Sequence, residues 1–169
     1  MAARCKTACR ERGSSVLDKL ATFVATSGYV GFVPVAPGTF GSAAGLALYI
    51  AVRLVDNVLA EAMTLVAAFA LGTWSAHRVE RIMGKDPGAV VIDEVLGMLV
   101  TLAFLNVTIA GAAAGFFLFR LLDVWKPFPA ARLEHLHGGP GIMLDDAMAG
   151  LYSNLVLRAL IAVWPGVFA

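Results

Sequence analysis

Charged residues are scarce in this chain, which sets it apart from ordinary soluble domains. Asp, Glu, Lys and Arg make up 15% of its 169 residues, and 59% are hydrophobic. The mean hydropathy is +0.79, whereas soluble domains carry about 25% charged residues. The composition predicts an integral membrane protein, with a soluble bundle of unusually apolar helices as the alternative.

Cysteine is nearly absent as well. Cys5 and Cys9 are the only two cysteines, and no second pair is present to complete a four-ligand zinc site. We expect two free thiols in a reducing compartment. A clean apolar signal-peptide core is also lacking, because the stretch after the first basic residues, SSVLDKLATFVATSG, is too polar.

Basic residues are sparse beyond the N-terminus, and no basic patch recurs among aromatic side chains. This pattern excludes a nucleic-acid partner. We expect residues 1–15 to be a disordered basic tail that faces anionic lipid or cytosol, and residues 16–169 to form one domain. The N-terminal basic residues are Arg4, Lys6, Arg10, Arg12 and Lys19.

Long apolar segments dominate the rest of the chain. They predict an all-α fold, an integral membrane helical bundle of four to five apolar helices. Residues 16–35, interrupted by Gly28, Gly31 and Pro34, predict an N-terminal interfacial or re-entrant helix. A segment of 15 residues reaches only about 22 Å, short of a hydrocarbon core of about 30 Å. The segments are 41–55, 58–76, 89–105, 107–122 and 147–164.

Loop charges predict the direction of the crossings. If the N-terminus is cytoplasmic, the basic loops 77–88 and 123–146 lie inside, and the outer turns around Asp56 and Asn106 carry almost no basic residue. This topology gathers four polar motifs on the inner face of the membrane. The motifs are PGTFGS (37–42), IDE (92–94), RLLDVWK (120–126) and HGGPGIMLDD (137–146).

Five carboxylates belong to these motifs. An acidic residue at the centre of a membrane helix costs about 2.5 to 3.5 kcal/mol, so the cluster needs protonation, cationic partners or a divalent ion. Hard oxygen ligands favour Mg²⁺, while His135 and His137 leave a small zinc site as an alternative. The carboxylates are Asp93, Glu94, Asp123, Asp145 and Asp146.

The same motifs hold groups that suit a phosphate. Arg120, Asp123 and Lys126 recur at every third position, which predicts either an intrahelical ion-pair ladder or a phosphate-binding pair beside the carboxylates. PGTFGS has the form of a helix start, in which Thr39 or Ser42 caps and free N–H groups favour an anion.

The glycine-rich loop at 137–141 lets the backbone come close to a ligand. Together the motifs predict phosphoryl chemistry on a lipid headgroup. Signatures of other phosphoryl-transfer enzymes are absent: a Cys followed six residues later by Arg, DxDxT, PSGH and DGxxAR. A small transporter with intramembrane carboxylates is the alternative, although it predicts acids near mid-span and these acids gather at one end.

The motifs APGTFGS (36–42), IDEVLGM (92–98), FRLLDVWKPFP (119–129) and HGGPGIMLDDAMAG (137–150) resemble those of the bacterial phosphatidylglycerophosphatase A family, in order and spacing. The resemblance implies a Mg²⁺-dependent phosphoric monoester hydrolase that converts phosphatidylglycerophosphate to phosphatidylglycerol and phosphate. It implies a location in the bacterial inner membrane among membrane lipids, with the active site facing the cytoplasm. Neither the motifs nor the composition indicates an oligomeric state.

The resemblance also implies site residues. The catalytic acids correspond to the five carboxylates. Among Asp93, Glu94, Asp145 and Asp146, we expect the metal ion to be held by Asp145, Asp146 and one of Asp93 or Glu94. Water or an aspartate is the attacking group. The expected substrate-binding set joins the polar family positions to the helix start and the glycine loop. It comprises Thr39, Ser42, Arg120, Lys126, His137, Gly138 and Gly139.

Overall fold

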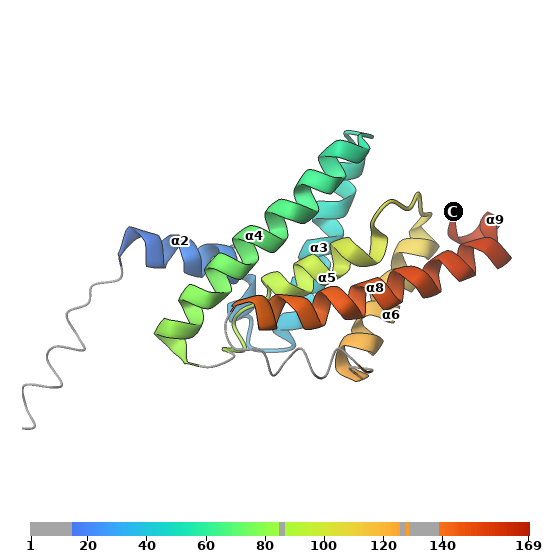
Figure 1. Cartoon of the computed structure of the whole chain (residues 1–169). Helices are drawn as coiled ribbons and strands as arrows, with labels where there is room; N and C mark the ends of the chain where they lie inside the picture. The colour runs from blue at the N-terminus through green and yellow to red at the C-terminus, as the bar shows by residue number, and fades with distance from the viewer. Residues whose placement is uncertain (1–14, 85–86, 126–127, 129–138) are drawn as a thin grey trace, which may run out of the picture.

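The computed structural model describes residues 15–84, 87–125, 128 and 139–169 (Figure 1). Within these ranges every regular element is helical, so the predicted all-α class is confirmed. The elements are α2 (Val16–Ala25), the 3₁₀ turn η1 (Val30–Phe32), α3 (Pro37–Arg53), α4 (Val58–Met83), α5 (Ile92–Leu102), α6 (Ile109–Trp125), α8 (Gly139–Val163) and α9 (Pro165–Phe168).

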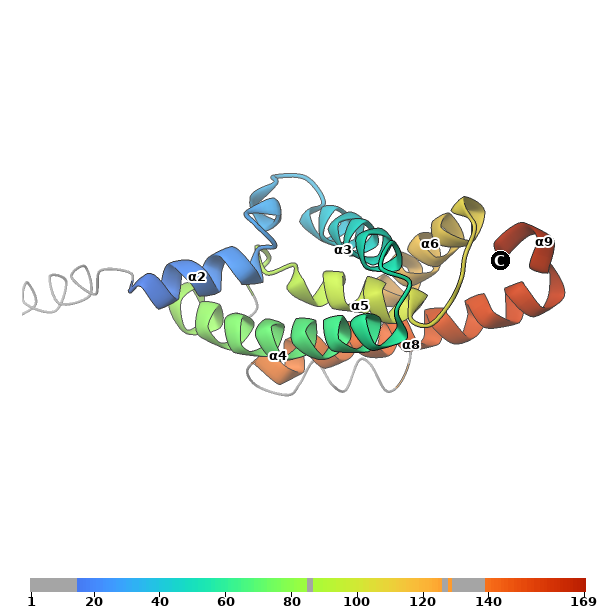
Figure 2. The ribbon, with the colours of Figure 1, turned by 90° about the horizontal axis from the view of Figure 1, so that it is seen from above.

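Helix α5 occupies the centre of the bundle. It packs against α3, α4, α6 and α8 (Figures 1 and 2), and 8 of its 11 residues are buried. At about 1.5 Å per residue it extends only about 16 Å, roughly half of a hydrocarbon core. The predicted segment 89–105 is therefore a core helix that is too short to cross a membrane by itself.

Two of the described helices are long and apolar enough to cross a membrane. They are α4, with 26 residues, and α8, with 25 residues. Both expose large apolar side chains on the outside of the bundle, such as Val66 on α4 and Leu155 on α8. Helices α3 and α6 have 17 residues each and reach about 26 Å. Length and composition are consistent with a membrane protein, and a bundle of four to five spans remains a prediction.

Helix ends follow local capping chemistry. Asn57, in the predicted break, accepts a hydrogen bond from the Leu59 N–H at 2.8 Å and starts α4. Ser15, expected at the end of the tail, instead forms a capping box with Asp18 and starts α2. The predicted interfacial stretch 16–35 thus divides into α2, a tight turn and η1.

The ends that carry the polar motifs gather at one end of the bundle. The first residues of α3, α5 and α8 lie there with the last turn of α6, toward the bottom of Figure 1. This end of the bundle holds the candidate site.

Candidate active site

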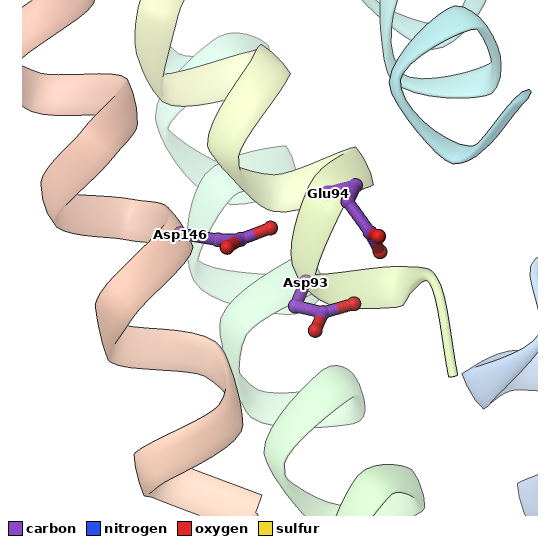
Figure 3. A group of neighbouring side chains, drawn as sticks. All are labelled: Asp93, Glu94 and Asp146. Carbon is purple, nitrogen blue, oxygen red and sulfur yellow. The ribbon is translucent and has the colours of Figure 1, made fainter. Parts of the chain in front are cut away.

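Three carboxylates from two helices form the core of the site. Asp93 and Glu94 lie in the first turn of α5, and Asp146 lies in the second turn of α8. One oxygen of each carboxylate lies within 4.8 Å of an oxygen of the other two. Figure 3 shows Asp146 reaching from α8 toward the start of α5, from which Asp93 and Glu94 project.

Each of these carboxylates has one oxygen that lacks a hydrogen-bond donor within the described residues. Asp93 Oδ1, Glu94 Oε2 and Asp146 Oδ2 are buried and have no partner there. Asp123 and Asp145 add their negative charges around Asp146. Unpaired buried charges of like sign are unfavourable. A divalent cation among their oxygens offsets the repulsion and gives the unpartnered oxygens a partner. The arrangement therefore fits a hard cation held by Asp93, Glu94 and Asp146.

Close contact between α5 and α8 brings the carboxylates together. A Cβ atom added to Gly150 on α8 would overlap the Gly97 carbonyl oxygen of α5, and a Cβ on Gly97 would overlap the Phe119 ring of α6. Both glycines lie about one helical turn beyond the acids, since Gly97 follows Asp93 by four residues and Gly150 follows Asp146 by four. Two glycines thus set the separation of the helices that share the site.

An arginine flanks the carboxylates. Arg120 Nη1 donates to Asp123 Oδ2 at 2.7 Å, and these side chains are 23% and 13% exposed. A Cβ atom on Gly38 would lie 3.2 Å and 3.3 Å from the two terminal nitrogens of Arg120 and would overlap Glu94 Oε1. The start of α3 therefore lies against both the acid cluster and the guanidinium. This contact is one half of the ion-pair ladder that the sequence offered as one of two interpretations, and its other half, Lys126, lies outside the described residues.

The start of α3 differs from the expectation. The helix begins at Pro37 after Ala36, which has a φ of 48°, and no side chain caps it. The predicted cap by Thr39 or Ser42 is wrong, because both residues lie inside the first turns. Ser42 is fully buried and its hydroxyl donates to the Gly38 carbonyl at 2.9 Å. Only Thr39, which is half-buried, keeps some exposure.

Helix α8 also begins earlier than expected. It starts at Gly139, eight residues before the predicted segment, so Asp145 and Asp146 lie in its second turn and not in its first. Asp145 is buried, and its Oδ1 accepts the Asp146 N–H at 3.0 Å. It stands beside the group of three carboxylates and is not one of its members. The register of α8 therefore gives the two adjacent aspartates different positions.

Other predicted positions have different outcomes. Lys126, His137 and Gly138, and the alternative zinc ligand His135, lie outside the described residues. Gly139 is buried, and a Cβ there would overlap the Thr73 carbonyl oxygen of α4, so close helix packing already explains this glycine.

Sequence reasoning did not single out the contact glycines of α5 and α8. They occur within the motifs IDEVLGM and DDAMAG, four residues after an acid in each case. That shared offset was the available signal.

Comparison with known proteins places the chain in a family. The family model for phosphatidylglycerophosphatase A matches residues 23–161. Phosphatidylglycerophosphatase A of Escherichia coli is 36% identical over 138 residues, which covers 80% of each chain. The Haemophilus influenzae protein of the same name is 35% identical over 133 residues, 77% of this chain and 82% of the relative.

A third relative carries another name. A Bacteroides thetaiotaomicron protein, provisionally described as a phosphatidylinositol-3-phosphatase, is 34% identical over 141 residues, 79% of this chain and 87% of the relative. No solved structure matches. The family match covers most of the chain and includes the carboxylates, Arg120 and the contact glycines. The chain belongs to the phosphatidylglycerophosphatase A family.

Proposed function

We propose that this chain is a Mg²⁺-dependent phosphatase that hydrolyses phosphatidylglycerophosphate to phosphatidylglycerol and phosphate. One observation carries the proposal. Three carboxylates, each with one buried and unpartnered oxygen within the described residues, converge beside Arg120, in a chain whose family relatives bear the name of this activity. The proposed location is the bacterial inner membrane, with the site at the cytoplasmic face, as the loop charges predict.

The donor set supports Mg²⁺ as the cofactor. Asp93, Glu94 and Asp146 would hold the ion, since each offers a hard carboxylate oxygen in a small common space. When bound, the ion polarises a phosphoryl oxygen and offsets the negative charge of the departing group. Neither a cysteine nor a histidine belongs to this group among the residues that the structure describes, which favours Mg²⁺ over Zn²⁺.

Arg120 is the proposed phosphate-binding group. Its guanidinium offers several N–H donors in a plane, which suits two oxygens of a phosphomonoester. Asp123 holds one terminal nitrogen at 2.7 Å and so orients the guanidinium beside Glu94 and Gly38. Positive charge fixed in advance at this place stabilises the charge on the phosphoryl oxygens as the ester bond breaks.

The attacking group is water or an aspartate of the cluster. Attack by water is a single in-line displacement and inverts the configuration at phosphorus, whereas an aspartyl-phosphate route needs two displacements and retains it. Hydrolysis in isotopically labelled water of a phosphorothioate analogue that is chiral at phosphorus distinguishes the two routes, because the thiophosphate product stays chiral. In either case Asp145, whose Oδ1 accepts the Asp146 N–H, adds negative charge beside the Asp146 carboxylate.

The decisive experiment is phosphate release from phosphatidylglycerophosphate by the purified full chain in lipid vesicles. We expect release in Mg²⁺, its loss on chelation and its recovery when Mg²⁺ is restored. Release that persists at full rate in excess chelator would refute the metal dependence. Failure to hydrolyse the lipid at any metal concentration would refute the proposed activity.

A second lipid substrate should be tested in parallel, because one relative is described as acting on phosphatidylinositol 3-phosphate. Both lipids are phosphomonoesters on a membrane surface, so the same carboxylates and arginine suit either. We expect a higher kcat/KM for phosphatidylglycerophosphate, the substrate in the names of two relatives. The opposite preference would change the substrate assignment and leave the proposed chemistry intact.

A further inference from the structure

The outward face of α2 is apolar and largely exposed in the described chain. Val16, Leu17, Leu20 and Phe23 are 74%, 51%, 50% and 49% exposed. At about 100° per residue these positions share an arc of roughly 120° on one side of the helix. The opposite side of α2 packs on α4 through the buried alanines at 21 and 25. The helix therefore has its larger apolar side chains facing away from the protein core.

An aromatic group extends this face past the end of α2. The Phe23 and Tyr29 rings meet edge to face with centroids 5.5 Å apart, and Tyr29 stacks on Phe32 with centroids 6.1 Å apart. All three side chains are about half exposed. Tyr29 has a φ of 71°, a left-handed conformation that non-glycine residues rarely adopt, which turns the chain so that its ring joins the other two. Amphipathic aromatic rings of this kind favour a membrane interface.

Charge around the face suits an anionic surface. Arg78 of α4 donates to Asp18 at 2.7 Å, and this hydrogen bond holds the pKa of the Asp18 carboxyl below its usual value. The one acid of α2 is thus paired with a cation. Lys19 stays exposed at the edge of the face, and the preceding sequence supplies Arg4, Lys6, Arg10 and Arg12 against Glu11 alone. Apolar side chains on a helix that follows a basic sequence are typical of segments that bind anionic lipid.

The face is joined firmly to the candidate site. The Val91 N–H donates to the Ala25 carbonyl at the end of α2, with an N to O distance of 2.9 Å. The backbone at Gly31 lies so close to Ala89 that a Cβ atom there would overlap the Ala89 carbonyl oxygen. Val91 directly precedes α5, so Asp93 follows two residues after the hydrogen bond. A surface bound by α2 would thus lie at the same end of the bundle as the carboxylates (Figures 1 and 2).

We propose that the outward face of α2, together with Tyr29 and Phe32, docks on an anionic lipid surface and holds the start of α5 at the membrane interface. Helix α2 packs on α4, one of the two helices long enough to cross a membrane, and Ile82 and Met83 near the end of α4 are exposed. The occupant of the face is therefore the leaflet that α4 enters. The inference goes beyond the proposed phosphatase activity and rests on it only for the substrate used in the second test.

The first test measures depth in the bilayer and needs no turnover. Full-length protein with Cys5 and Cys9 replaced by serine receives one cysteine, at Leu20, Lys19 or Asp56, for an environment-sensitive fluorophore. Asp56 is the water-exposed control, with its side chain 87% exposed in the turn between α3 and α4. In vesicles of phosphatidylcholine and phosphatidylglycerol, we expect acyl-chain quenchers to quench the Leu20 label strongly and the Asp56 label weakly. Aqueous iodide should quench the Asp56 label strongly and the Leu20 label weakly. The label at Lys19 should show intermediate quenching with both kinds of quencher.

Two results of that test would overturn the proposal. If iodide quenches the Leu20 label as strongly as the Asp56 label, the face lies in water. If the label is protected from both quenchers and loses this protection when the protein is diluted into excess lipid, a second copy of the chain covers the face.

The second test measures the consequence for catalysis. We expect Leu17→Glu combined with Leu20→Glu to lower kcat/KM on vesicle-borne phosphatidylglycerophosphate by about tenfold, because two half-exposed leucines lose their apolar contact with lipid. Activity on a short-chain, micelle-dispersed analogue should stay within about twofold, which shows an intact site. Equal loss on both substrates would mean that α2 supports the fold and not the interface. Wild-type chain inactive on both would count against the phosphatase proposal and leave the quenching result untouched.

Discussion

The two ends of the helix bundle each bury acidic residues, but they treat them differently. At the end opposite the site, Glu61 is 6% exposed, yet its Oε1 accepts the Phe104 N–H at 2.7 Å and its Oε2 lies 3.7 Å from Arg53. Arg53 also donates to Asn106. At the site end, Asp93, Glu94 and Asp146 each leave one buried oxygen without a partner in the described chain. A buried acid with its donors in place is structural, and a group of acids without donors points to a ligand.

The opposite end also satisfies its helix carbonyls. Asn154 of α8 donates its Nδ2 hydrogens toward the carbonyls of Val100, Thr101 and Ala103, and Arg158 donates to Asn154 and to Ala103. These bonds close the C-terminal end of α5, whose other end begins with the unpartnered acids. The short helix α5 thus has one end held by hydrogen bonds and one end with unpartnered carboxylate oxygens. The stable packing at the first end allows the unfavourable grouping of charges at the second.

The comparison predicts that equivalent amide substitutions have opposite effects at the two ends. Asp146→Asn should lower kcat by about 10³-fold, because the site loses an anionic ligand worth several kcal/mol of transition-state stabilisation. Its thermal stability without Mg²⁺ should be equal to that of wild type or higher, since one of several repelling charges is gone. Phosphate release and thermal unfolding in the same detergent check both. An active Asp146→Asn chain at saturating Mg²⁺ would remove this residue from the site.

Mg²⁺ should stabilise the protein only through the end of the bundle where carboxylate oxygens lack hydrogen-bond partners. At a Mg²⁺ concentration of about 100 times its dissociation constant, binding to the folded state alone adds about 2.7 kcal/mol to the free energy of unfolding. We expect a rise in Tm for wild type and none for Asp146→Asn, measured with Ca²⁺-free buffers and a chelator baseline. An equal rise in both chains would place the ion elsewhere in the molecule.

Part of this contrast could be predicted from the sequence. Helix segments followed from apolar runs, and the break at Asp56 and Asn57 matched the start of α4. The acids were predicted to gather because each lay at the same end of an apolar segment. The burial of α5 could not be predicted, since a helix in lipid and a helix in a protein core have the same apolar composition. Only its length of 11 residues separates the two cases.

The start of α3 in PGTFGS could be predicted from the sequence, whereas the start of α8 at Gly139 could not, because Gly-Pro-Gly usually breaks a helix. Gly38 is the second residue of α3 and Gly139 the first residue of α8, and at both positions another chain segment leaves no room for a Cβ atom. Successive residues of a helix point about 100° apart, so Asp145 and Asp146 face different directions. Which of them faces α5 depends on how α8 is oriented about its own axis, and packing sets that orientation.

The spacing of α5 and α8 offers a way to damage the site without changing any acid. Gly150→Ala should force the two helices apart, because the new Cβ would overlap the Gly97 carbonyl oxygen. We expect a loss of about 1 to 3 kcal/mol of stability from overpacking and a rise of about tenfold in the Mg²⁺ concentration that gives half-maximal activity. Gly88→Ala is the matched control, as a Cβ there meets nothing within 4 Å. A normal Mg²⁺ response in Gly150→Ala would show that this contact does not set the site geometry.

The smallest expected effect is at the end that is already satisfied. Glu61→Gln keeps an acceptor for the Phe104 N–H but removes the negative charge that faces Arg53, so it should cost about 1 to 2 kcal/mol of stability. Activity below the unfolding transition should stay within about twofold of wild type, and the response of Tm to Mg²⁺ should be unchanged, because the substitution lies at the far end of α5 from the carboxylates. Comparison of Asp146→Asn with Glu61→Gln thus distinguishes an acid that binds a ligand from an acid that stabilises the fold. A Glu61→Gln chain that kept its stability and lost its Mg²⁺ response would mean that the two ends are coupled through α5 more tightly than their separate hydrogen bonds indicate.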